Sequence, residues 1–216
     1  KYKGNNMKKL IVLLFGAAFT FATSAFAGGL VGVKFGNGDL TGDADTYTAG
    51  STSYAASSGS KDASFGALFA EYEIPNDNVP LSIGVEYVPF DADVSLDGKR
   101  SETSANVSDF TTVYLLAAHD AGNATVYGKV GYSQADIGTV KSKSTVVSQS
   151  GDLEGTTIAV GVQTDELASG IVVRAEMSHT EFDKVKITTT SNGSASVAKT
   201  ADGELQTFTI SLAKAF

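Results

Sequence analysis

The sequence of 216 residues contains no cysteine and no tryptophan, and it has only three prolines and two histidines. Without cysteine, the chain cannot form a disulfide framework or use a thiolate as a nucleophile or a metal ligand. A metal site would have to rest on the two histidines and the carboxylates, and no spacing among these residues indicates one. We therefore expect no cofactor and no metal.

Positive charge is also scarce. The chain has 16 Lys and Arg residues against 24 Asp and Glu residues, which gives a formal net charge of −8. Binding to nucleic acid requires a basic face that contacts phosphates, and an interaction tail would show as a block of like charges. Neither feature is present, so nucleic acid is excluded as a partner.

Long hydrophobic runs are almost absent. The longest is LIVLLFGAAFTFA at residues 10–22, and its 13 residues are too few for a membrane-spanning helix, which needs about 20. The run follows a basic start, MKK, and precedes an A-x-A cleavage site at residues 25–27. These are the three parts of a secretory signal peptide. We therefore expect residues 1–27 to be removed and residues 28–216 to form a single domain.

The domain alternates between apolar segments with a period of two and polar segments rich in Ser, Thr, Gly, Asp and Asn. A period of two indicates β-strands, and no stretch after residue 27 shows helical periodicity. Strands are predicted at residues 29–36, 64–74, 81–90, 108–118, 125–135, 155–164, 171–182 and 205–216. Their lengths approach the roughly 9–11 residues with which a tilted strand crosses a bilayer.

In each segment, the apolar set of alternate residues is assigned to one face of the sheet. In residues 108–118, for example, this face is predicted to comprise Phe110, Thr112, Tyr114 and Leu116. Glycines recur on the predicted strands, and we expect them to make room for bulky neighbours in a tight barrel.

The connections between the segments alternate in length. Those at residues 75–80, 119–124 and 165–170 are short turns, whereas the others are long and polar. The long connections cover residues 37–63, 91–107, 136–154 and 183–204. Short turns at one end and long loops at the other are the layout of an outer-membrane barrel. With eight strands, the last would pair with the first and leave no sheet edge in lipid.

The C-terminal segment has an alternating apolar pattern that ends in phenylalanine. Phe208, Ile210, Leu212 and the terminal Phe216 share one face of the last predicted strand. This pattern resembles the C-terminal signature of bacterial outer-membrane β-barrel proteins. Together with the signal peptide and the strand number, it makes the chain similar to the small OmpA/OmpX-like or opacity-type barrels, here without a periplasmic domain.

The resemblance implies an all-β fold, an eight-stranded antiparallel up-and-down transmembrane β-barrel in the bacterial outer membrane. It implies short turns in the periplasm and long polar loops outside the cell. The partners that it implies are outer-membrane lipid, lipopolysaccharide, the barrel-assembly machinery that reads the C-terminal signature, and an extracellular loop partner that the sequence does not identify. A structural or surface-interaction role follows.

If the apolar faces contact lipid, the opposite faces line the lumen. This inward set contains three cations and three anions: Lys34, Glu71, Glu86, Lys129, Arg174 and Glu176. Interior charges are costly unless they are paired, and an eight-stranded barrel is just wide enough for side chains to fill it. We hypothesise that these six residues form an ion-pair network that plugs the barrel.

Three alternative functions stay open: a narrow small-solute channel, a lipid A-modifying barrel enzyme, and a soluble lipocalin-like binding barrel with its apolar face inward. An enzyme would need a nucleophile beside a base. Ser178 and His179 are adjacent on a predicted strand and therefore point to opposite faces. We expect no catalytic residues and no enzymatic activity. The sorted connections and the terminal phenylalanine disfavour the soluble barrel.

Overall fold

The computed structural model describes residues 28–216, except for 50–51, 76–79, 90–91, 99–100, 138–140, 143–144, 151 and 192–196. The predicted signal peptide at residues 1–27 lies outside this part of the chain. Within the described residues, no helix is long and apolar enough to cross a membrane.

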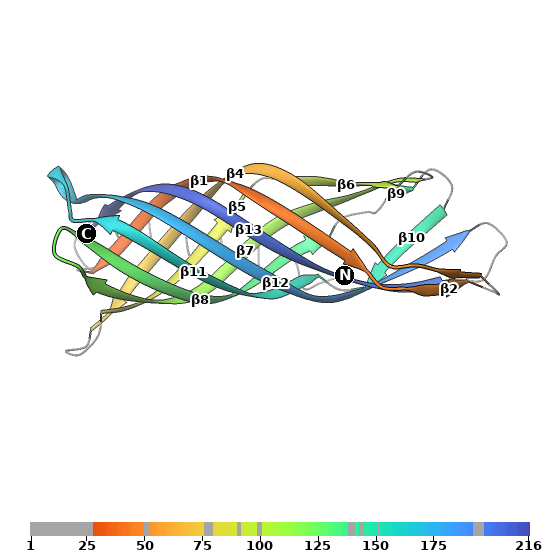
Figure 1. Cartoon of the computed structure of the whole chain (residues 1–216). Coiled ribbons are helices and arrows are strands. Elements are labelled where there is room, and N and C mark those ends of the chain that lie inside the picture. The colour runs from red at the N-terminus through yellow and green to blue at the C-terminus, as the bar shows by residue number, and fades with distance from the viewer. Residues whose placement is uncertain are drawn as a thin grey trace.

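Eight long strands form the wall of a closed antiparallel barrel (Figure 1). They are β1 (Gly29–Ala44), β4 (Ser57–Ile74), β5 (Leu81–Val88), β7 (Ser101–Asp120), β8 (Ala124–Ile137), β11 (Leu153–Thr164), β12 (Ile171–Ser191) and β13 (Val197–Ala215). Each strand pairs with its neighbours in this order, and β1 pairs with β13 from Leu30↔Ala215 to Ala44↔Ala201. The predicted eight-stranded, up-and-down closed barrel is therefore confirmed.

Shorter elements extend or join these strands. Strand β6 (Ala92–Gly98) pairs with β7, while β9 (Lys141–Ser142) and β10 (Thr145–Ser150) continue the wall beside β7 and β12. Strands β2 (Tyr47–Ala49) and β3 (Thr52–Tyr54) form a separate hairpin, and the 3-10 helix η1 spans Ala168–Gly170.

The prediction of four long loops was wrong, because much of each predicted loop belongs to paired strands. Strands β1 and β4 remain paired as far as Ala44↔Ser57, and β12 and β13 as far as Thr189↔Val197. Strand β7 pairs with β6 as far as Ser101↔Gly98. The backbone ladder is satisfied by its own hydrogen bonds, whatever the polarity of the side chains. A change to polar side chains thus marks where the lipid-facing band ends, not where the strand ends.

Side-chain contacts also hold this polar part of the wall together. The Thr200 hydroxyl donates to Asp45 Oδ2 over 2.7 Å, and Lys184 Nζ donates to the same oxygen over 3.0 Å. These contacts hold the pKa of the Asp45 carboxyl below its usual value, the Thr200 hydrogen bond contributing most. The contacts to the carboxylate therefore persist at neutral pH and are lost as the pH falls through that lowered pKa.

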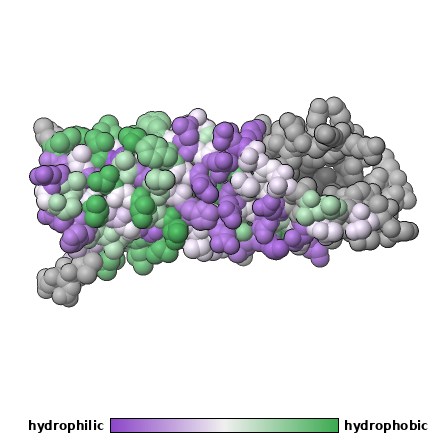
Figure 2. All heavy atoms as spheres, viewed as in Figure 1, coloured by the Kyte–Doolittle hydropathy of each residue, from purple (hydrophilic) through white to green (hydrophobic). Residues whose placement is uncertain are grey.

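Many large apolar residues of the barrel face outward. Phe35, Val160 and Met177 expose 65%, 65% and 62% of their surface. Figure 2 shows these residue types gathered in a band near the short-turn end, followed by a hydrophilic zone. Such a band is the lipid-contacting surface of a membrane barrel. The soluble lipocalin-like alternative, which requires the apolar face inside, is therefore wrong.

Inside the barrel, large aromatic side chains lie against glycines on the neighbouring strand. Tyr114 pairs with Gly84, and Tyr127 pairs with Gly161. A Cβ atom on Gly84 would lie 2.4 Å from the Tyr114 ring, and one on Gly161 would lie 2.2 Å from the Tyr127 ring. By contrast, a Cβ atom on Gly128 would meet nothing within 4 Å. Gly84 and Gly161 therefore make room for bulky neighbours, as the sequence predicted for glycines on the strands.

We predict that Gly84→Ala lowers the free energy of unfolding by about 1–3 kcal/mol, because the added methyl group must displace a buried ring. Gly128→Ala is the matched control and should leave stability unchanged or slightly raise it, since the unfolded chain loses freedom. Urea unfolding of the two variants in lipid vesicles measures the difference. Equal stabilities would show that Tyr114 does not pack on Gly84 as described.

Candidate functional site in the barrel lumen

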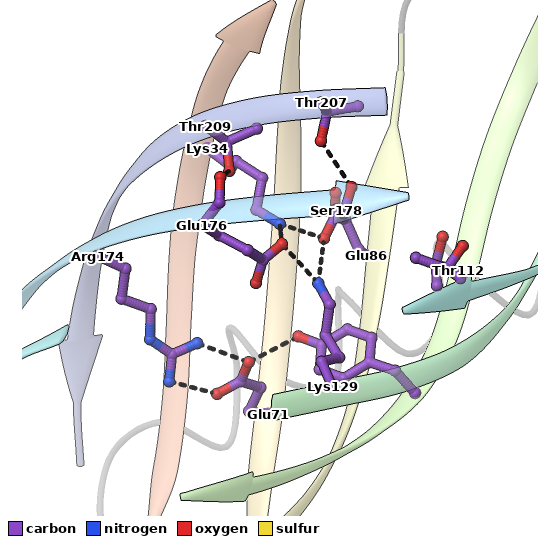
Figure 3. Close-up of polar contacts among 12 residues, drawn as sticks. Lys34, Glu71, Glu86, Thr112, Lys129, Arg174, Glu176, Ser178, Thr207 and Thr209 are labelled. Atoms are coloured by element: carbon purple, nitrogen blue, oxygen red, sulfur yellow. Dashed lines mark hydrogen bonds and ion pairs between the residues drawn. The ribbon is translucent and has the colours of Figure 1, made fainter. Parts of the chain in front are cut away.

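Six charged side chains lie inside the barrel near its middle (Figure 3). They come from five strands: Lys34 from β1, Glu71 from β4, Glu86 from β5, Lys129 from β8, and both Arg174 and Glu176 from β12. Each is between 4% and 8% exposed. Because strand residues alternate between faces, an exposed apolar neighbour such as Phe35 or Met177 directs the adjacent charged residue inward. These are the six positions that the sequence assigned to the lumen.

Four of these residues form one cluster. Lys34 Nζ donates to Glu86 Oε2 over 2.6 Å and to Glu176 Oε1 over 2.7 Å. Lys129 Nζ donates to Glu176 Oε1 over 2.8 Å and to Glu86 Oε2 over 3.3 Å. Each ammonium group thus bridges both carboxylates, and each carboxylate bridges both ammonium groups. We call this arrangement the four-charge cluster; its formal charge is zero.

The other two residues form a bidentate pair. Arg174 Nη1 and Nη2 donate to Glu71 Oε1 and Oε2, each over 2.7 Å. Arg174 Nε also donates to Gln163 Oε1 over 2.8 Å. Parallel donation to a carboxylate is the strong geometry of an arginine ion pair. The six residues therefore lie together but form two neutral groups, the four-charge cluster and this pair.

Two tyrosines join the groups. The Tyr114 hydroxyl donates to Glu71 Oε1 over 2.7 Å, and Lys129 Nζ lies 4.4 Å from the centre of the Tyr114 ring. The Tyr127 hydroxyl donates to Glu176 Oε2 over 3.0 Å, and the Arg174 guanidinium lies 5.1 Å from the Tyr127 ring. Each ring thus contacts one group through its hydroxyl and the other through a cation–π contact.

The sequence did not identify these two tyrosines as part of the network, and its face assignment for β7, the strand of Tyr114, was wrong. Tyr114, Thr112 and Leu116 face the lumen and are buried, whereas Val113 and Leu115 are 53% and 51% exposed. Both alternate sets are apolar here, so polarity does not distinguish the faces. The pairing of β7 with β8 also shifts between Ser108 and Thr111, as in a β-bulge, which changes the alternation locally. The glycines opposite the tyrosines were the only usable signal.

A row of hydroxyl groups lies beside the four-charge cluster. The oxygens of Thr112 and Ser133 are 2.7 Å apart, those of Ser133 and Thr157 are 2.5 Å apart, and those of Thr157 and Thr180 are 2.7 Å apart. All four residues are buried. The row links strands β7, β8, β11 and β12 across the inner wall and satisfies polar groups that burial would otherwise penalise.

The ion pairs separate two cavities. One, of ≈ 520 Å³, lies toward the short turns and is lined by Glu71 and Arg174 among others. The other, of ≈ 150 Å³, lies toward the long hairpins and is lined by Glu86, Lys129 and Glu176 together with apolar residues. The charged side chains thus lie between the two cavities.

The C-terminal residues singled out in the sequence lie on the outer face of the barrel. Phe208, Ile210, Leu212 and Phe216 are 52%, 47%, 52% and 41% exposed. The backbone amide of Phe216 donates to the Gly29 carbonyl over 3.0 Å, which ties this strand to β1. Lys214, which interrupts the apolar pattern, donates from Nζ to the Ser169 carbonyl. The row forms a lipid-facing stripe, interrupted at Lys214, beside the strand pair that closes the barrel.

The two residues considered for acyl transfer are separated by the strand itself. Ser178 shares a hydrogen bond with Thr207 over 2.6 Å and lines the inner cavity of ≈ 150 Å³. Its neighbour His179 belongs to the opposite, outward face of β12, in the same alternate set as the exposed Met177. Among the described residues, no group of three or more His, Asp or Glu side chains could hold a metal ion.

A family model described as "Outer membrane protein beta-barrel domain" matches residues 10–216. A comparison with curated proteins gave no match. Among solved structures, the outer membrane protease OmpT from Escherichia coli is 10% identical over 90% of this chain and 99% of that chain, with a TM-score of 0.52. Likeness at this identity shows the fold alone.

Two further structures are similar at lower TM-scores. Ail, the attachment invasion locus protein of Yersinia pestis, is 12% identical over 87% of this chain and 99% of its own, with a TM-score of 0.45. Neisserial surface protein A is 11% identical over 85% of this chain and 97% of its own, with a TM-score of 0.40.

We predict that Arg174→Met lowers the free energy of unfolding by about 3–5 kcal/mol, because it leaves the Glu71 carboxylate buried without its cation. The double variant Glu71→Gln with Arg174→Met should recover much of this loss, since no uncompensated charge remains. Urea unfolding in lipid vesicles measures both. The exposed Lys184, changed to Met, is the control and should have little effect. Additive losses in the double variant would contradict the pairing.

Proposed function

We propose that this chain, which belongs to the outer membrane β-barrel protein family and resides in the bacterial outer membrane, is a barrel that does not conduct solutes. Its function then lies in its presence in the membrane and in the surface that it presents beyond the lipid. The observation that carries this proposal is the position of six paired charges between the two lumenal cavities.

A closed lumen follows from the energetics of these charges. Each carboxylate and each cation of the network is buried and contacts an opposite charge at 2.6–3.3 Å. Separating a buried pair leaves an uncompensated charge, which costs several kcal/mol on the general scale of such pairs, about 3–5 kcal/mol. Thermal motion alone therefore opens a continuous water path only rarely. This supports a plug over the small-solute channel that the sequence left open.

A surface role is supported by the length of the wall beyond the apolar band. The paired strands continue through polar sequence to Ala44, Ser57 and Ser191. In barrels of this architecture the short turns lie in the periplasm and the longer connections face outward. The polar part of the wall then meets the lipopolysaccharide layer and presents the hairpins to an extracellular partner. The outward row ending at Phe216 is the segment that we assign to the barrel-assembly machinery.

We propose no catalytic activity. The similarity to the protease OmpT is limited to the fold, and it does not assign a catalytic residue to this chain. The charged side chains of the lumen are engaged with one another, and Ser178 and His179 belong to opposite faces of β12. A hydrolytic centre needs a nucleophile in hydrogen-bond reach of a base, and neither arrangement provides one.

We predict that the purified chain shows no steady conductance in planar lipid bilayers. The double variant Glu86→Ala with Lys129→Ala removes one charge of each sign, so it should open the lumen to water and produce discrete current steps. Glu73→Ala, which removes an exposed carboxylate near the short turns, serves as a control and should behave like the unchanged chain. Steady, large conductance of the unchanged chain would refute the plug and establish the channel.

A second test concerns the structural role. Strands β2 and β3 form a sheet of their own, so replacing residues 46–55 with a two-residue Asn-Gly turn should leave the barrel intact. Cells that lack the chain should become more sensitive to detergent, and the shortened and complete chains should restore resistance equally. If deletion leaves detergent sensitivity unchanged, the structural role is wrong. If only the complete chain restores resistance, the role belongs to the hairpin surface instead.

A further inference from the structure

The cavity on the long-hairpin side of the four-charge cluster has the properties of a small-molecule site. It has a volume of ≈ 150 Å³ and lies inside the barrel wall. Its apolar lining includes Leu40, Phe65, Val88, Phe110, Phe182 and Leu205. The rings of Phe110 and Phe182 meet edge to face, with their centres 6.2 Å apart, although they come from strands on different sides of β8 and β11. The cavity is thus a lumenal space with apolar walls.

The size and the walls of this cavity suit a compact apolar body. Apolar cavities of about 150 Å³ in other proteins stay dry and accept a molecule as small as benzene. Ligand sites typically combine such walls with a few polar groups that fix the orientation of the ligand. The relevant polar groups here are the hydroxyl row and the four-charge cluster, both of which border the same space.

The hydroxyl row leaves one donor for a ligand. Three hydrogen bonds join four hydroxyl groups, so one of the four hydroxyl hydrogens is not used within the row. When all three bonds run in the same direction, this hydrogen belongs to an end residue, Thr112 or Thr180. Both end residues line the cavity. An oxygen atom of a bound molecule can accept this hydrogen, and such pairing makes a molecule with an oxygen atom preferable to a pure hydrocarbon.

The charged residues that line the cavity disfavour an ionic ligand. Glu86, Lys129 and Glu176 line the cavity, and with Lys34 they form a cluster of zero formal charge in which each group contacts opposite charges. The cluster therefore offers no net charge to compensate an ionic ligand, and burying an unpaired ion beside it would be costly. The further charged residue of the lining, Lys61, is exposed and does not belong to this buried cluster. An uncharged ligand avoids this cost.

We propose that this cavity binds a small uncharged molecule with a compact apolar body and a single hydroxyl or carbonyl oxygen, of the class of phenols and short alcohols. The apolar walls hold the body, and the end hydroxyl of the row contacts the oxygen. The ion pairs close the site toward the short turns, so the ligand exchanges on the long-hairpin side and does not pass through the barrel. Binding is therefore compatible with a lumen that conducts no solute.

The test uses phenol as the probe and the full chain folded in lipid nanodiscs. Saturation-transfer NMR measures how phenol binding saturates with concentration. Val88→Phe fills the cavity from β5, whereas Val85→Phe adds the same bulk on the outward face of that strand. We expect saturable binding to the unchanged chain and to Val85→Phe, and at least a tenfold loss of affinity in Val88→Phe. Heat-dependent migration on a gel verifies that each variant is folded.

Non-saturable uptake that is equal in all three proteins would mean that phenol only partitions into the lipid, and it would overturn the proposal. Equal saturable affinity in Val88→Phe would place the binding elsewhere and overturn it as well. Because the readout is binding, it is independent of the conductance test: a conducting barrel could still bind phenol, and a closed barrel could fail to do so.

A second pair of measurements tests the hydroxyl contact. The double variant Thr112→Val with Thr180→Val keeps the side-chain shapes and removes both end hydroxyls. Phenol affinity should fall about three- to tenfold, the range for the loss of one hydrogen bond, while toluene affinity should stay unchanged. If both affinities change equally, the oxygen of the ligand does not contact the hydroxyl row, and that part of the assignment is wrong.

Discussion

The structure depends on the need to neutralise charge inside a narrow barrel whose outside is apolar. Strand alternation directs every second side chain inward, and lipid contact requires the other set to be apolar. Charged residues in the spanning part can therefore lie only in the lumen. There, Lys34, Lys129 and Arg174 meet Glu71, Glu86 and Glu176 at hydrogen-bond distances, and the formal charge of the group is zero. Because these charges are buried, removing one partner leaves an uncompensated charge, and the closed lumen that we propose rests on the same pairing.

The same strands pass through two environments. Within the apolar band, the outer residues contact lipid, and the inner ones contact each other; beyond it, polar residues on the same strands contact water. The closing pair of β1 and β13 runs without interruption from Leu30↔Ala215 to Ala44↔Ala201. Continuous backbone pairing lets the wall cross this boundary, and it gives the barrel a polar upper part that remains ordered by its own hydrogen bonds.

Sequence alone predicted the barrel, its eight spanning strands and the outward face of seven of them, because the polarity of alternate residues differs sharply on those strands. It failed on β7, where Val113 and Tyr114 are both apolar in character and a bulge shifts the pairing. The sequence predicts loops where the strands in fact continue beyond the apolar band. Polar side chains there indicate contact with water, but they do not indicate whether the backbone is still paired. The six lumenal charges followed from alternation, but their partition into two groups, and the tyrosines that join them, required the cross-strand register.

The central claim is that the lumen at the level of the ion pairs excludes water, and thiol accessibility tests it most directly. The chain has no cysteine, so Ser211→Cys introduces a single thiol, buried and paired with Lys34 and Arg174 across the neighbouring strands. In lipid vesicles, this thiol should resist a small water-soluble reagent that readily modifies Asp43→Cys on the exposed polar wall. Rapid modification of Ser211→Cys in the folded barrel would mean that water fills the lumen and would contradict the account.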